Sequence, residues 1–152
     1  MKTKHLIILA AGGSAALLLG AFAFQYLGGL APCKLCLWQR WPHGAAVLIG
    51  AALLAGAGAR LAWAGAAAAL ATAGVGLYHT GVERGWWTGP DTCTSGAIDG
   101  LSTDALMDQI LNAPLVRCDD VAWQMLGLSM ASWNALASLA LAVLWGLAAR
   151  RG

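Results

Sequence analysis

Four long apolar blocks occupy most of this 152-residue chain. A membrane-spanning helix needs about 20 mainly apolar residues, and helices of roughly that length are predicted at residues 5–24, 38–59, 61–79 and 129–149. The second apolar run, Gly44–Ala59, is short unless its helix begins near Trp38. Only 11% of the residues are charged, against about 25% in soluble domains. The sequence therefore predicts an all-α membrane protein, a four-transmembrane-helix bundle in a single domain of residues 1–152.

The predicted helices are rich in alanine and glycine. Small residues recur four positions apart in Ala52 and Gly56, and again in Gly65, Ala69 and Ala73. In lipid, small side chains let helix backbones approach each other closely. These positions are therefore predicted to lie between helices.

The first apolar block also has features of a signal peptide. Lys2 and Lys4 form a basic start, and Ala21–Ala23 resembles a cleavage site. The apolar run is longer than the 7–15 residues typical of a signal peptide. A lipoprotein signal ending at Cys33 would need a small residue where Pro32 stands. We therefore expect an uncleaved membrane helix.

Orientation follows from Lys and Arg in the short loops. A cytoplasmic N-terminus places Lys2, Lys4, Arg60, Arg150 and Arg151 inside, and Lys34, Arg40, Arg84 and Arg117 outside. The excess of Lys and Arg on the cytoplasmic side is slight. It becomes larger if Arg40 is counted as a functional-site residue and not as a topology signal. We expect both termini in the cytoplasm, with a short loop at about 25–37 and a long loop at about 80–128 on the outer side of the membrane.

The four cysteines lie in these two loops. Cys33 and Cys36 occupy the short loop, and Cys93 and Cys118 the long one. An even number of helices separates the loops, so all four cysteines face the same side. With a cytoplasmic N-terminus that side is the oxidising compartment, where disulfides persist.

Three other uses of the cysteines compete with redox chemistry, namely a zinc site, a haem attachment site and structural disulfides. Structural zinc sites usually show two close pairs, but Cys93 and Cys118 are far apart in sequence, so we expect no metal. A c-type haem needs His directly after the second Cys, where this chain has Leu37. Structural staples remain open for the loop pair, because a bridge there would stabilise the fold by about 3.5 kcal/mol on the chain-entropy estimate. The Cys33-x-x-Cys36 spacing closes almost no chain, which favours redox reactivity.

Thiol chemistry at the first pair requires a stabilised thiolate. If a helix begins near Cys33, the positive end of its dipole favours an anion there. Arg40 follows Cys36 by four residues and would share its helix face, so it could stabilise the Cys36 thiolate or a reduced acceptor. Pro42 leaves open whether the helix starts before or after it. An interfacial anchoring role for Arg40 is the alternative.

The first pair needs an electron acceptor. The chain has no dinucleotide fingerprint, haem motif or iron–sulfur spacing. The short loop holds the sulfurs at the depth of the lipid headgroups, so a membrane quinone is the expected acceptor. His79, at the outer end of the third helix, could bind a quinone oxygen or move protons. The alternative is an interfacial residue paired with Glu83.

The long loop contains a predicted amphipathic helix. Its apolar stripe is capped by Ser102 or Thr103 and comprises Leu106, Met107, Ile110 and Leu111. This helix would lie on the membrane or a partner, or pack on top of the bundle. A loop disulfide can meet a soluble thiol that the membrane-pinned pair cannot reach, so two pairs could form a relay.

The chain resembles the DsbB family of quinone-linked disulfide bond formation proteins over nearly its whole length. The resemblance rests on Pro32-Cys33-x-x-Cys36-x-x-Gln39-Arg40, on Tyr78-His79-Thr80, on Cys93, and on the stretch from Cys118 to Trp133. Gln39 stands where some members have an acid, which puts a proton role there in doubt.

The resemblance implies an enzyme, a membrane thiol:quinone oxidoreductase. A periplasmic thioredoxin-like protein of the DsbA type would attack Cys93, Cys118 would then attack Cys33, and Cys36 would reduce ubiquinone or menaquinone. The implied redox disulfides are Cys33–Cys36 and Cys93–Cys118, with Arg40 and His79 at the quinone. The expected partners are thus this thiol protein, the quinone pool and the lipid bilayer, with no nucleic acid.

Three alternatives stay open. One is a non-enzymatic tetraspan protein stapled by disulfides. Another is a specialised DsbB paralogue with a dedicated partner. The third is an enzyme like vitamin K epoxide reductase, which fits less well because its essential Cys-x-x-Cys lies late in the chain.

Overall fold

The structure is a computed structural model that describes residues 2–94, 100, 102–111 and 116–152. Parts of the expected long loop, residues 95–99, 101 and 112–115, lie outside the described residues. The described elements are α1 (Thr3–Tyr26), α2 (Lys34–Leu54), the 3₁₀ turn η1 (Ala59–Leu61), α3 (Ala62–Glu83), α4 (Thr103–Leu111), β1 (Gln124–Met125), β2 (Leu128–Ser129) and α5 (Met130–Arg151).

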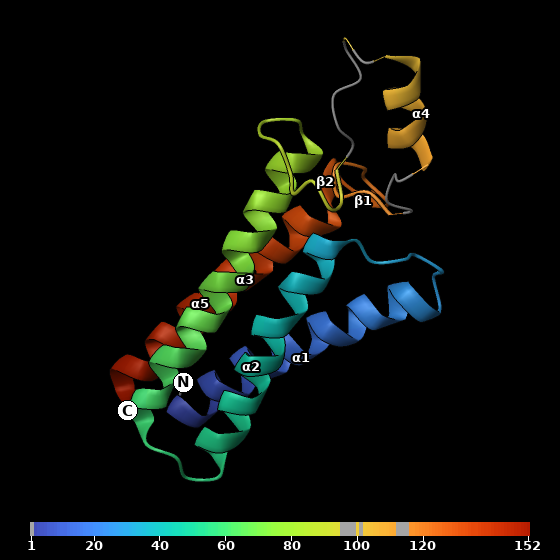
Figure 1. Cartoon of the computed structure of the whole chain (residues 1–152). Helices are drawn as coiled ribbons and strands as arrows, with labels where there is room; N and C mark the ends of the chain where they lie inside the picture. Colours follow the sequence, from blue (N-terminus) through green and yellow to red (C-terminus); the bar gives the residue numbers. More distant parts are fainter. Residues whose placement is uncertain (1, 95–99, 101, 112–115) are drawn as a thin grey trace.

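The four long helices form a bundle in which α1 and α3 each pack against both α2 and α5. The chain termini lie together at one end with the α2–α3 connection, and α4 and the β1–β2 hairpin lie at the other end (Figure 1). At the first end the Thr3 hydroxyl donates to the Arg151 carbonyl at 3.4 Å. The cysteine-bearing segments are therefore remote from both termini.

Three helical segments are long and apolar enough to cross a membrane, namely Thr3–Tyr26, Ala59–Glu83 and Met130–Arg151. The expected second span, α2, is 21 residues long but is not among them. Its first turns contain Lys34, Gln39 and Arg40, which lower its mean hydropathy. The described residues thus show a helical membrane protein with three membrane-capable helices.

Helix α2 begins earlier than the sequence indicated. The expected range was 38–59, whereas the helix runs from Lys34 to Leu54 and passes through Pro42 without a break. Cys33 is its N-cap, with its sulfur accepting a hydrogen bond from the Cys36 backbone N–H at 3.2 Å. Capping satisfies one of the free N–H groups of the first turn, which explains why the helix starts at the motif. The first connection is correspondingly shorter than residues 25–37.

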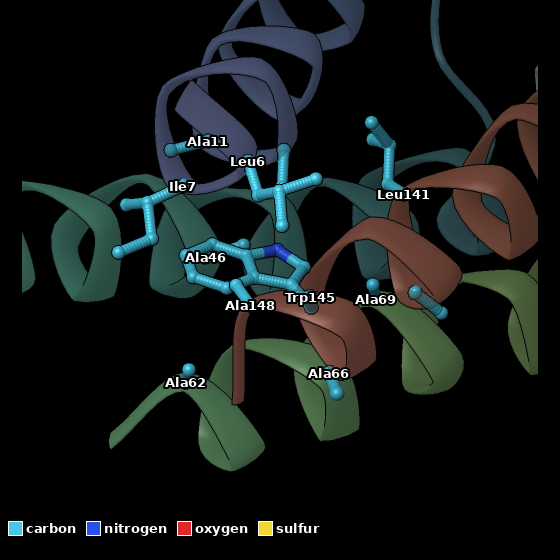
Figure 2. Packing of buried hydrophobic residues seen from close by; sticks show 12 residues of the cluster. Leu6, Ile7, Ala11, Ala46, Ala62, Ala66, Ala69, Leu141, Trp145 and Ala148 are labelled. Carbon is cyan, nitrogen blue, oxygen red and sulfur yellow. The ribbon is translucent and has the colours of Figure 1, made fainter. Parts of the chain in front are cut away.

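Close packing on small residues forms the membrane-embedded core. Trp145 of α5 is fully buried, surrounded by alanines of the neighbouring helices and by Leu6 and Ile7 of α1 (Figure 2). A Cβ at Gly65 would stand only 2.6 Å from the Trp145 ring. The predicted stripe of Gly65, Ala69 and Ala73 is buried as expected.

The other predicted stripe, Ala52 and Gly56, is not an interhelical contact. Ala52 is only half-buried and Gly56 is exposed. Gly56 lies beyond the C-terminus of α2 with a φ of +102°, where glycine tolerates a backbone that other residues rarely adopt. Its role is therefore to end the helix.

Two small elements accompany the bundle at its far end. The amphipathic helix of the long loop is present as α4, with the Ser102 hydroxyl accepting from the Ala105 N–H at 3.3 Å. Its apolar residues Met107, Ile110 and Leu111 are exposed, so the packing of this stripe on the bundle is not observed among the described residues. The β1–β2 hairpin was not expected, and it leads directly into the α5 cap at Ser129.

Candidate functional site

Cys33 and Cys36 lie at the N-terminus of α2 as free thiols with their sulfurs 2.8 Å apart. The Cys33 thiol donates to the Cys36 sulfur. That hydrogen bond, together with burial, raises the pKa of Cys33 well above its ordinary value. Cys33 is buried and Cys36 is half-buried. When one proton leaves the pair, the negative charge therefore rests on Cys36, the more accessible sulfur.

Arg40 lies one helical turn beyond Cys36, because α2 is continuous through Pro42. Its guanidinium turns toward α1, donating to the Gln25 side-chain oxygen at 2.6 Å and lying 4.9 Å from the centre of the Phe22 ring. Its Nε has no hydrogen-bond partner among the described residues. The cation is thus fixed beside the dithiol with one donor unused.

His79 of α3 is buried against the dithiol. Its Nε2 lies 3.5 Å from the Cys33 sulfur and 3.8 Å from a carboxylate oxygen of Glu83, one turn along the same helix. The side chain of Glu83 is only 6% exposed, and its Oε2 has no partner among the described residues. The structure thus places His79 between Cys33 and Glu83.

A largely apolar cavity of about 340 Å³ opens between α1, α2, α5 and the segment before the hairpin. Its polar lining includes Cys36, Arg40, His79 and Glu83. Small-molecule sites are typically concave, mostly apolar and about 300–1,000 Å³ in volume, with a few polar groups that fix orientation. The cavity can therefore take a lipid-soluble ring next to the Cys36 sulfur.

The second cysteine pair is a disulfide, Cys93–Cys118, with Cα atoms 5.3 Å apart. Both residues are buried, at 2% and 0% exposure, and they pack in one cluster with Cys33. Cys36 packs against this cluster. A hydrogen bond of 2.9 Å from Lys34 to the Thr92 hydroxyl further links the two segments. Sequence separated the pairs into two loops, and the fold brings all four sulfurs into a single region.

The Cys33, Cys36 and His79 ligand atoms lie within 4.8 Å of one another. Two sulfurs bound to one zinc ion at about 2.3 Å in a tetrahedron stand about 3.8 Å apart. The two sulfurs, 2.8 Å apart, are therefore too close together to be ligands of one zinc ion in this geometry.

Three polar residues behind the dithiol, two of them buried and one half-buried, were not identified from the sequence. His43 of α2, Thr72 of α3 and Asn134 of α5 are linked by side-chain hydrogen bonds to Gln39 or to one another. Polar residues within apolar spans are rare and mark functional sites. That rule alone would have pointed to His43, which lies within the second predicted span.

Comparison with known proteins gives one family. The family model described as Disulfide bond formation protein DsbB matches residues 3–148. A relative from Rickettsia prowazekii (strain Madrid E), named Uncharacterized protein RP370, is 25% identical over 131 residues, covering 84% of this chain and 76% of its own. No solved structure matches.

Proposed function

Because the chain belongs to the DsbB family of disulfide bond formation proteins, we propose that it is a membrane thiol:quinone oxidoreductase. In this role it reoxidises a periplasmic DsbA-like dithiol protein and passes the electrons to quinone. The observation that carries the proposal is the single cluster containing both cysteine pairs, with Cys36 opening onto an apolar cavity. The arrangement connects a thiol-exchange site to a site for a lipid-soluble acceptor.

The proposed topology has four spans in one domain, with α2 as the fourth. Helix α2 packs on α1 and α3 like a member of the bundle. Its polar first turns, which lower its hydropathy, are those that carry the site. With the termini in the cytoplasm, the four cysteines face the periplasm of the bacterial inner membrane.

The proposed relay consists of thiol–disulfide exchanges. A partner thiolate attacks Cys93, forming a mixed disulfide and displacing Cys118 as a thiolate. Cys118 attacks Cys33, so the Cys118–Cys33 bond forms, the Cys33–Cys36 bond breaks, and the electron pair rests on Cys36. The partner's second thiolate would then attack the mixed disulfide, releasing the partner as a disulfide and freeing Cys93, which would attack Cys118 and re-form the Cys93–Cys118 bond with Cys33 leaving as a thiolate. Re-forming the Cys33–Cys36 bond would pass two electrons, with two protons, to quinone, so the net reaction converts a partner dithiol and quinone into a partner disulfide and quinol.

The loop disulfide must be uncovered for the first step. Cys93 is only 2% exposed, and thiol exchange requires access to the attacked sulfur. Part of the segment that covers it, around Val116 and Cys118, must therefore lift when the partner docks.

The residues lining the cavity fit a quinone. Arg40 would hold a ring oxygen beside Cys36, His79 would line the site next to Cys33, and the apolar lining would take the ring and tail. Arg40 lines this cavity, and a guanidinium is a hydrogen-bond donor of the kind that carbonyl oxygens accept from. Bound quinone would supply the two-electron sink that the chain itself lacks.

The test is quinone reduction by a reduced thioredoxin-like partner, with the purified protein in detergent. Cys36→Ser should abolish turnover, whereas Leu37→Ala, at an exposed neighbouring position, should keep it. Full activity of Cys36→Ser would overturn the assignment of Cys36. If the wild-type protein shows no turnover with ubiquinone or menaquinone, the non-enzymatic alternative is favoured.

A further inference from the structure

A chain of buried polar side chains runs from the interior of the bundle to the dithiol. Gln39, which is 6% exposed, lies at its centre, between Asn134 of α5 and His79 of α3. Such a network is stable in a low-dielectric interior only if each donor meets an acceptor. The direction of each hydrogen bond can therefore be worked out from groups whose role is fixed.

The Leu35 carbonyl fixes the orientation of the Gln39 amide. A carbonyl oxygen only accepts, and the Gln39 side-chain atom 3.2 Å from Leu35 O must therefore be the NH₂ group. The same NH₂ lies 3.0 Å from His79 Nδ1. The amide thus presents a donor to His79, and Nδ1 must be the acceptor.

The other end of the network agrees with this assignment. The Gln39 side-chain oxygen accepts from the Asn134 NH₂ at 2.7 Å. That NH₂ also donates to the Thr72 hydroxyl at 3.2 Å, and the hydroxyl donates to the Gln39 backbone carbonyl at 3.1 Å. Reversing the Gln39 amide would bring two NH₂ groups together at Asn134 and two oxygens together at Leu35.

We propose that Gln39 is a positioning residue that holds neutral His79 with its proton on Nε2. A neutral imidazole has one donor and one acceptor nitrogen, so an Nδ1 that accepts from Gln39 leaves the proton on Nε2. That nitrogen lies 3.5 Å from the Cys33 sulfur. His79 therefore donates to Cys33, and is not placed as a base for the Cys33 thiol.

This inference deepens the proposed function and rests on it for its chemical consequence. In the relay, Cys33 is the sulfur that Cys118 attacks. A donor to Cys33 draws electron density from that sulfur and favours the attack, while the pair of the broken bond goes to Cys36. Protonation of His79 at Nδ1 would require Gln39 to turn away, so His79 assists without changing its charge.

The ionisable groups that contact the His79 ring or line the same cavity come from three segments. Helix α2 and its cap contribute Cys33, Cys36 and Arg40, α3 contributes Glu83, and the segment before the hairpin contributes Arg117 and Asp120. Glu83, at 3.8 Å, and the Cys118 backbone, which forms a hydrogen bond with the His79 ring, compete with Cys33 for the ring proton. Both are acceptors and cannot donate to Nδ1, so among the described residues Gln39 is the group that selects the tautomer.

Nitrogen-15 NMR of histidine-labelled protein tests the proposal, because the protonated and bare nitrogens of a neutral ring have well-separated shifts. The full chain is studied in detergent, and the His79 signals are assigned by their loss in His79→Gln. The expected spectrum shows a neutral ring with the proton on Nε2 throughout the neutral pH range. A proton on Nδ1, a mixture of tautomers or a cation would overturn the proposal.

Gln39→Glu tests the role of Gln39 itself. A carboxylate cannot donate to Nδ1, so the proton should move to Nδ1 or the ring should become a cation, and quinone reduction should acquire a new pH dependence. Gln124→Glu, the same change at an exposed position, should alter neither readout. An unchanged His79 tautomer in folded Gln39→Glu would refute the role.

If Gln39→Glu fails to fold, the wild-type spectrum still decides the His79 tautomer. Gln39→Met then takes the place of Gln39→Glu as the test of Gln39. A mixture of His79 tautomers is expected in Gln39→Met, and the unchanged wild-type tautomer would count against a role for Gln39. The NMR readout needs neither quinone nor partner. A wild-type protein with the expected tautomer but no turnover would therefore refute only the proposed function.

Discussion

The close packing of the Trp145 ring against Gly65 gives the most specific prediction about stability. A Cβ at Gly65 would lie 2.6–2.8 Å from three atoms of the buried indole ring, whereas carbon atoms pack best at about 3.5–4.0 Å. Gly65→Ala therefore requires α3 and α5 to separate by about 1 Å, or the ring to leave its position. Gly74→Ala, on the same helix, meets no atom within 4 Å and serves as the matched control.

The two variants share one favourable contribution. Alanine is a better helix former than glycine by about 0.8–1.0 kcal/mol, and Gly74→Ala should stabilise the protein by up to that amount. Overpacking of a filled core typically costs about 1–3 kcal/mol. Gly65→Ala should therefore be less stable than Gly74→Ala by about 1–3 kcal/mol.

The measurement is reversible unfolding in mixed micelles with increasing SDS, followed by far-ultraviolet circular dichroism. Both variants are compared with the wild-type protein under the same conditions. Equal free energies of unfolding for Gly65→Ala and Gly74→Ala would show that Trp145 does not sit on Gly65, and the packing described for the core would be wrong.

Three further outcomes follow from the site. Since the raised pKa of Cys33 keeps that thiol protonated at neutral pH, iodoacetamide should label Cys36 first in the dithiol form, and equal labelling by mass spectrometry would contradict the assigned hydrogen bond. Asn134→Ala leaves its buried amide partner on α2 unsatisfied and should cost about 1–3 kcal/mol in SDS unfolding; no loss would argue against the network. Arg117→Gln removes the exposed ion pair with Asp119 and should leave the unfolding midpoint nearly unchanged, because exposed ion pairs contribute little; a clear loss of stability would contradict this.

The beginning of α2 shows how far local patterns reach. Sequence placed Cys33, Cys36 and Arg40 near a helix start, but Pro42 left two starts open. The expected range began at residue 38, before Pro42, but proline is disfavoured in the interior of a helix, so a start after Pro42 stayed open. The structure has Pro42 inside the helix, and packing against α1 and α3 overrides that preference.

Most hydrogen-bond partners of His79 could not be predicted from the sequence, for a different reason. Glu83 was suggested by its i, i+4 spacing, and the structure has that pair. Gln39 and Asn134 come from other helices, and nothing in a single sequence gives the relative rotation of three helices. The contact of His79 with Gln39 therefore emerged only from the folded bundle.

The sequence by itself determined that this chain is a helical membrane protein, because apolar length and composition act locally on each segment. It also determined that two cysteine pairs occupy the segments between predicted helices. Tertiary structure decided that the pairs share one buried cluster, that an apolar cavity reaches Cys36, and that Gln39 faces His79. Those features depend on distances between residues far apart in the chain, and such distances are set by the packing of small residues around Trp145 and by the Cys93–Cys118 bridge.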